Sequence, residues 1–266
     1  MAGIVRRLWQ QPLRTPPAWR FALSSCRRST TSTPLNHYAS RSYSTYKPTR
    51  ELPDADVEVY ENMRARKLDK WGWVIYRTSY QDQATWERFK EYLDQADREY
   101  LSTSKAPQLL DFRELTYFDD ESLFNNASRP ALREHFKKWR QEALPREQPR
   151  MDFTWPVWET RYELFFQVDD ETMETFKKHA SEHLSPYDER VRMKVIQADF
   201  KREEDMEDYW EEGFGEDMEE IDGTKGEEVG WMYTVPGGVG HNFYEYLGEE
   251  YCWHRFYVRP PGVCIY

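Results

Sequence analysis

The segment 71–93 places the strongest constraint on how this chain can fold. Its residues 73–80 are mostly β-branched or aromatic, which predicts a strand. Asp82 follows, and its carboxylate can accept the free amides of a helix start. An apolar stripe at helical spacing comes next, made of Trp86, Phe89 and Leu93. The segment therefore predicts a strand, a tight polar turn and an amphipathic helix.

A fainter copy of this pattern follows about ninety residues later. Residues 161–168 predict a strand, and Asp169 or Asp170 can cap the helix after it. That helix carries a stripe of Met173, Phe176, Ala180 and Leu184. Because strand, aspartate cap and stripe recur in the same order, the sequence favours duplicated β-α units.

The remaining elements complete an α+β pattern. Further strands are predicted over 109–118, 191–200 and 229–235, and a helix is predicted from the cap Ser128 to Pro145. We expect an arrangement similar to a ferredoxin-like sandwich, with a four- to five-stranded, mostly antiparallel sheet and helices on one face. A doubly wound parallel sheet is less favoured, because its strands would read as uninterrupted apolar runs.

The domain organisation follows from charge. Residues 1–50 hold eight Arg, one Lys and no acid, which is typical of a mitochondrial presequence, with processing expected after Tyr43. The alternative is a disordered basic tail. We expect a matrix location if the segment is a presequence and a cytoplasmic one otherwise. Residues 51–70 form a lead-in segment, and 71–266 form a single α+β domain.

Acidity limits the partners of that domain. The 266-residue chain has a net charge of −11, and residues 51–266 hold 28 basic and 48 acidic side chains. Such a body repels phosphate backbones, so nucleic acid is not an expected partner. No apolar run is long enough to span a membrane. Residues 203–228 hold fourteen acids and predict a solvated excursion, with a docking surface for a basic partner as the alternative.

One motif has metal-ligand spacing. His179 and His183 stand four residues apart with Glu182 between them, as in inverted zincins. No third ligand can be assigned, and a histidine near a helix end also suits the negative end of the helix dipole. A zinc hydrolase is therefore the least favoured reading, and we expect no cofactor.

Two other motifs have ordinary explanations. The glycine-rich run 237–240 precedes a helix but lacks the Lys-Ser/Thr of a nucleotide loop, which favours a turn. Cys252, His254 and Cys264 fit no usual zinc spacing. Cys252 with His254 or His241 as its base is a nucleophile hypothesis without an orienting third group.

Aromatic density raises the question of a pocket. The default role of so many Trp and Tyr side chains is core filling. A sheet faced by such rings can also bound an apolar small-molecule pocket. The candidate ligand-binding residues are those in which segment 71–93 differs from its copy, namely Trp73, Arg77 and Trp86.

Several stretches resemble a large group of uncharacterised filamentous-fungal proteins. The likeness covers roughly residues 68–262 and lies in Trp71-Gly-Trp-Val-Ile-Tyr-Arg-Thr-Ser-Tyr with Trp86-Glu-Arg-Phe, in Gly230-Trp-Met and in Phe256-Tyr-Val-Arg-Pro-Pro. It implies no activity and no catalytic residues. The leading hypothesis is therefore a soluble, acidic binding protein for a protein or small-molecule partner. The alternative is a cofactor-free enzyme or accessory protein of a fungal small-molecule (secondary-metabolite) pathway.

Overall fold

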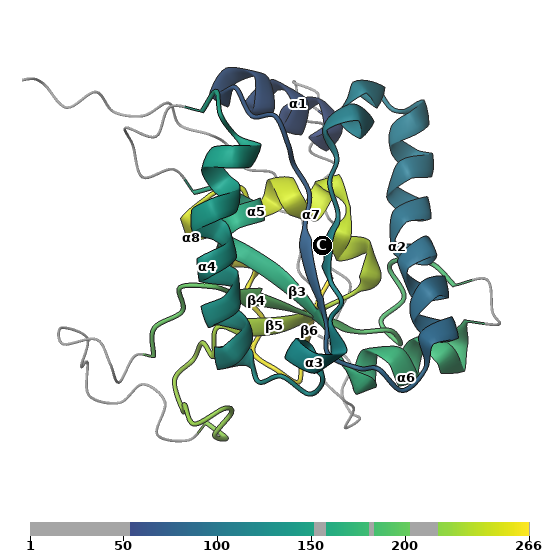
Figure 1. Cartoon of the computed structure of the whole chain (residues 1–266), viewed down its shortest axis with the longest axis vertical. Coiled ribbons are helices and arrows are strands. Elements are labelled where there is room, and N and C mark those ends of the chain that lie inside the picture. The colour runs from purple at the N-terminus through teal and green to yellow at the C-terminus, as the bar shows by residue number, and fades with distance from the viewer. Residues whose placement is uncertain (1–53, 152–157, 181–183, 203–217, 266) are drawn as a thin grey trace, which may run out of the picture.

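The computed structural model describes residues 54–151, 158–180, 184–202 and 218–265 (Figure 1). Its helices are α1 (Ala55–Arg66), α2 (Gln83–Thr103), α3 (Glu121–Phe124), α4 (Arg129–Glu147), α5 (Thr160–Glu163), α6 (Asp170–His179), α7 (His241–Tyr246) and α8 (Glu250–Phe256), with 3₁₀ helices η1 (Pro107–Phe112) and η3 (Pro236–Val239). Among the described residues, no helix combines the length and the apolar character that crossing a membrane requires.

The sheet has six strands in the order β2-β1-β3-β4-β5-β6. They are β1 (Val74–Arg77), β2 (Thr116–Phe118), β3 (Leu164–Val168), β4 (Met193–Gln197), β5 (Trp231–Thr234) and β6 (Val263–Cys264). The pairs β1–β2, β1–β3 and β5–β6 are parallel, and only the two pairs of β4 are antiparallel. The α+β class is confirmed, while the expectation of a mostly antiparallel four- to five-stranded sheet is wrong.

Helices cover both faces of this sheet, not one. Figure 1 shows α4 and α2 on opposite sides of the strands. The core under α1, α2, α6 and α7 takes Ile75 of β1 and Phe166 of β3, whereas the core under α3 and α4 takes the neighbouring Tyr76 and Phe165. Since successive side chains of a strand point to opposite faces, both faces of β1 and β3 are buried.

Polar side chains interrupt the apolar runs of the central strands. Their sequences therefore resemble those of half-exposed antiparallel strands, although both faces of the sheet are covered. Arg77, Gln167, Lys194 and Thr234 all lie within strands, and each is at most 5% exposed. Their polar atoms are mostly satisfied by internal contacts, which lets them occupy buried positions. A rule that expects purely apolar parallel strands therefore fails for this chain.

Several helices and strands begin or end at other residues than the sequence predicts. Pro107 starts a 3₁₀ helix over the first part of the predicted strand 109–118, so only 116–118 pair in the sheet. Residues 160–163 form one helical turn before β3 begins. Helix α4 continues past Pro145 to Glu147 and ends two residues later than predicted.

The two β-α units have the predicted local structure. Asp82 accepts a hydrogen bond from the Thr85 amide at 3.0 Å, and Asp169 accepts one from the Thr172 amide at 3.2 Å. Strands β1 and β3 are parallel neighbours, and Phe89 of α2 meets Phe176 of α6 with ring centroids 4.8 Å apart. The caps and the stripe of α2 are confirmed, but α6 ends at His179, so its stripe holds Met173 and Phe176 while the predicted Ala180 and Leu184 follow the helix.

Both ends of the described chain pack on the body. Helix α1, within the expected lead-in segment 51–70, buries Val59 and Met63 against the core and lies beside α7. The aromatic C-terminal segment also packs on the body, because Trp253 is fully buried and β6 pairs with β5. The basic segment 1–50 and most of the acidic run 203–228 lie outside the described residues.

Candidate functional site

The structure places Trp73 in the centre of the core. Its side chain is 0% exposed, and its ring lies 4.7 Å from the ring of Phe166 and 5.6 Å from that of Tyr244. Its indole N–H has no hydrogen-bond partner. Trp73 therefore fills space between β1, β3 and α7, and it lines neither of the two best-formed cavities of the described residues.

Arg77 and Trp86 do meet, but in an internal clamp. The Arg77 guanidinium donates to Gln83 Oε1 at 2.6 Å and to Asp119 Oδ1 at 3.1 Å, and it lies 5.2 Å from the Trp86 ring. Trp86 donates its indole N–H to Asp119 Oδ2 at 2.7 Å. This clamp joins the ends of β1 and β2 to the start of α2, and it leaves Arg77 2% exposed.

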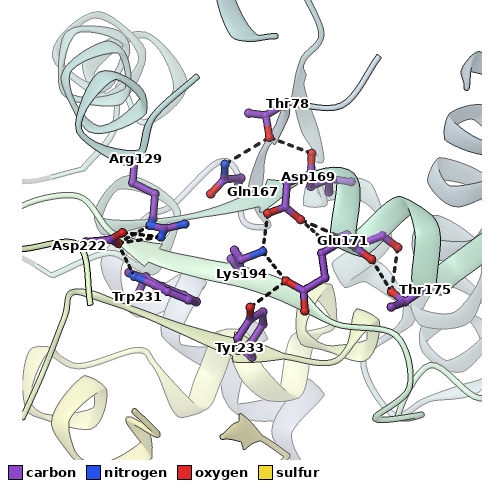
Figure 2. A network of polar contacts seen from close by, with 12 residues as sticks. Thr78, Arg129, Gln167, Asp169, Glu171, Thr175, Lys194, Asp222, Trp231 and Tyr233 are labelled. Carbon is purple, nitrogen blue, oxygen red and sulfur yellow. Dashed lines mark hydrogen bonds and ion pairs between the residues drawn. The ribbon is translucent and has the colours of Figure 1, made fainter. Parts of the chain in front are cut away.

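A second polar network lies at the same edge of the sheet (Figure 2). Lys194 of β4 stands between Gln167 of β3 and Tyr233 of β5 in the strand register. Its ammonium donates to Asp169 and, at 3.0 Å, to Glu171 Oε2, which also accepts the Tyr233 hydroxyl at 2.8 Å. Parallel sheets commonly bind ligands outside the carboxyl ends of their strands, so this network occupies a favoured position for a site.

The polar groups of this network are bonded to one another. Two carboxylates, from Asp169 and Glu171, form ion pairs with the buried Lys194 side chain. Burial, together with the hydrogen bond to Glu171, raises the pKa of Tyr233 well above its ordinary value, so its hydroxyl stays neutral. Beside this network, Lys177 of α6 pairs with Asp82 at the start of α2 at 2.6 Å. The carboxyl edge is thus cross-linked by its own side chains.

The histidine and cysteine motifs are not assembled into a site among the described residues. His179 Nδ1 lies 3.2 Å from Arg190 Nη1, while Glu182 and His183 lie outside the described part of the chain. No group of three potential metal ligands occurs in that part. Cys252 and Cys264 are both buried, and burial raises the pKa of Cys252, which disfavours the thiolate.

The structure also contains a buried Asp–His pair that the sequence does not predict. His241 Nδ1 lies 2.9 Å from Asp97 Oδ1, and Asp97 also accepts from Arg113 Nε at 2.8 Å. The Nε2 atom of His241 is buried and has no partner. The pair joins α2 to the start of α7, across 144 residues of sequence, so no local pattern could have shown it.

A further candidate is a surface hollow of about 300 Å³ beside α1. We call it the cationic hollow, and it is lined by Tyr60, Met63, Arg64, Lys67, Leu68, Phe112 and Arg150. Its three basic side chains are exposed, while its floor is aromatic or apolar. Arg150 pairs with Asp69, and Arg64 lies 5.8 Å from the Tyr60 ring. Among the described residues, no carboxylate forms an ion pair with Arg64 or Lys67.

A smaller cavity of about 60 Å³ lies on the other side of α1. We call it the carboxylate cavity, and its lining includes Asn62, Arg66, Glu159, Tyr244, Glu245 and Glu249. Arg66 bridges Glu159 at 2.9 Å and Glu249 at 3.1 Å. Burial raises the pKa of Glu245 to about 7, with the negative charge of Glu58 adding to the shift.

Fold and sites together define an α+β protein with a mixed six-stranded sheet, a closed carboxyl edge and two cavities that flank α1. No family model matches the chain, and neither the curated proteins nor the solved structures yield a match.

Proposed function

We propose that this chain is a binding protein for a small anionic molecule with an apolar body, and that the ligand lies in the cationic hollow. The observation that carries the proposal is the lining itself. Arg64, Lys67 and Arg150 surround a floor that includes Met63 and Phe112, in a volume of about 300 Å³. Small-molecule sites are typically about 300–1,000 Å³, mostly apolar, and supplied with a few polar groups that fix orientation.

The charge of the hollow contrasts with that of the rest of the chain. Residues 51–266 hold 48 acidic and 28 basic side chains, yet three basic side chains converge here. A carboxylate, sulfonate or phosphate gains charge-assisted hydrogen bonds from such a group. The apolar floor adds affinity in proportion to the ligand surface that it removes from water. The polar side chains at the carboxyl ends of the strands are paired with one another. This pairing supports a binding role for the chain over catalysis at that edge of the sheet.

The fluorescent sulfonate 8-anilinonaphthalene-1-sulfonate tests this proposal, because it joins a permanent anion to an aromatic body. We expect saturable binding to the folded chain and competition by decanoate but not by decanol. Replacing Arg64→Gln and Lys67→Gln together is expected to weaken binding by roughly tenfold or more, since each charge-assisted contact contributes about 1.5–3 kcal/mol. Titrations followed by fluorescence measure the dissociation constants.

The matched control removes the same charge elsewhere. Lys138 on α4 and Lys178 on α6 are exposed and lie outside the hollow. A Lys138→Gln, Lys178→Gln variant is expected to bind like the unchanged chain. Equal losses in both double variants would mean that general charge attracts the probe, and the proposed site would be abandoned. Near-ultraviolet circular dichroism checks that every variant is folded.

A mitochondrial matrix location is proposed separately, on the composition of residues 1–50 alone. A fusion of this segment to a fluorescent reporter is expected to enter mitochondria. Replacing Arg6→Ser and Arg7→Ser lowers the positive charge of the segment and is expected to reduce import. A reporter that stays in the cytosol with the unchanged segment would contradict the location.

A further inference from the structure

Helix α1 separates two cavities of opposite charge. Met63 and Leu68 line both the cationic hollow and the carboxylate cavity. On one side α1 presents Arg64 to the hollow, and on the other it presents Arg66 to the carboxylates. Any shift of α1 against α7 therefore changes the wall of the hollow.

Carboxylates outnumber cations on the α7 side. From α1, Glu58, Asn62 and Arg66 face Glu245, while Glu159 precedes α5 and Glu249 follows α7. Arg66 is the only cation in the lining of this cavity among the described residues, and it already bridges Glu159 and Glu249. Glu245 Oε1 accepts a hydrogen bond from Asn62 Nδ2 at 3.0 Å. Ionised Glu245 therefore has a neutral hydrogen-bond partner and two like-charged neighbours, Glu58 and Glu249, while the attraction of Arg66 is shared with Glu159 and Glu249.

We propose that the contact between α1 and α7 is a proton-controlled latch on the cationic hollow, tightened when Glu245 is protonated. Protonation removes the cost of burying a charged Glu245 and its repulsion by Glu58 of α1, and these outweigh the Asn62 hydrogen bond and the attraction of Arg66. It also removes a negative charge from the cavity that shares Met63 and Leu68 with the anion site. Both effects favour anion binding at lower pH. This inference rests on the proposed function of the hollow for its consequence, but not for the latch itself.

The sign of the pH dependence follows from the direction of the shift. The pKa of Glu245 is about 7 in the folded chain, above its ordinary 4.5. The folded state therefore binds this proton more tightly than the unfolded state does. The resulting stabilisation is fully present below pH 4.5 and is lost as the pH rises through 7. Between pH 6 and 8 this group alone is expected to lower the folding equilibrium constant roughly tenfold.

The test compares Glu245→Gln with the unchanged full-length chain, without ligand and with 8-anilinonaphthalene-1-sulfonate, at pH 6 and pH 8. Without ligand, urea unfolding measures the folding equilibrium constant. Between pH 6 and pH 8 this constant is expected to fall roughly tenfold more in the unchanged chain than in the variant. With the probe, the unchanged chain is expected to bind several-fold more tightly at pH 6 than at pH 8. The variant is expected to bind equally well at both values.

Glu163→Gln is the matched control. Burial also raises the pKa of Glu163 to about 7, but its partners are Arg140 and Asp199, and none of the three lines either cavity. This variant is expected to lose its own share of the pH-dependent stability while keeping the pH dependence of probe binding. If it abolishes that dependence as Glu245→Gln does, the effect is general stability and the latch is wrong.

The two proposals fail in different ways. If the probe does not bind, or binds outside the hollow, the proposed function fails while unfolding without ligand still tests the latch. If the probe binds in the hollow with the same affinity at pH 6 and pH 8, or if Glu245→Gln leaves the pH dependence of unfolding unchanged, the latch is overturned and the binding proposal stands.

Discussion

Replacing Trp73 with alanine is expected to lower the free energy of unfolding by about 3–5 kcal/mol. The indole is 0% exposed and contacts the rings of Phe166 and Tyr244, so its removal leaves a cavity that the surrounding strands cannot fill. Its unpartnered N–H offsets part of this loss, because the variant no longer buries that group. Urea unfolding followed by circular dichroism measures the change.

This result separates a core residue from a pocket residue. Leu123 is a suitable control, because it is 63% exposed and its replacement by alanine is expected to change stability by less than about 0.5 kcal/mol. If the Trp73→Ala variant folds with a loss below about 1 kcal/mol, the tryptophan does not fill the core. The hypothesis of an aromatic ligand pocket at Trp73 would then regain support.

Replacing Arg161 with methionine is expected to cost about 3–5 kcal/mol, for an electrostatic reason. The Arg161 guanidinium is fully buried and donates to Glu147 Oε2 at 2.9 Å, to Glu114 O at 3.0 Å and to Thr116 Oγ1 at 2.7 Å. Burial raises the pKa of Glu147, but the hydrogen bond and charge of Arg161 outweigh it, so the pKa stays below its ordinary value. Methionine would leave this buried carboxylate with the Tyr162 hydroxyl and the largely exposed Arg146, 3.6 Å away, in place of its buried cation.

A double substitution identifies the cause. Adding Glu147→Met removes the carboxylate that has lost Arg161, and it is expected to restore a substantial part of the stability. The exposed pair Lys177–Asp82 is the control, and Lys177→Met there is expected to cost less than about 1 kcal/mol. If the double variant is as unstable as the sum of the two single variants, the loss comes from packing and not from an unpaired charge. Thermal unfolding at pH 7 supplies all the values.

The candidate site shows how little of a surface can be read from local patterns. The sequence predicts ligand-binding residues where segment 71–93 differs from its copy, at Trp73, Arg77 and Trp86. The structure buries all three. The cationic hollow brings Arg64 and Lys67 from the end of α1 beside Phe112 and Arg150. These positions are far apart in the sequence, and no spacing rule connects them.

Local structure, by contrast, was determined by the sequence. The aspartates Asp82 and Asp169 cap the helices that follow them, and the stripes through Phe89 and Phe176 face each other, because capping and helical periodicity depend on neighbours within a few residues. Four predicted strands contain an observed one, β1, β3, β4 and β5, whereas most of the predicted strand 109–118 forms other structure.

Strand direction and the covering of both faces were decided only by the tertiary structure. A strand's direction depends on the crossover that precedes it, and α2 and α4 lie on opposite faces of the sheet. Buried polar side chains such as Arg77 and Lys194 are stable only because distant carboxylates, from Asp119 and from Asp169 with Glu171, meet them in the folded chain. In the sequence these residues look like the polar positions of half-exposed strands. Their partners, supplied by other elements, make them part of the interior.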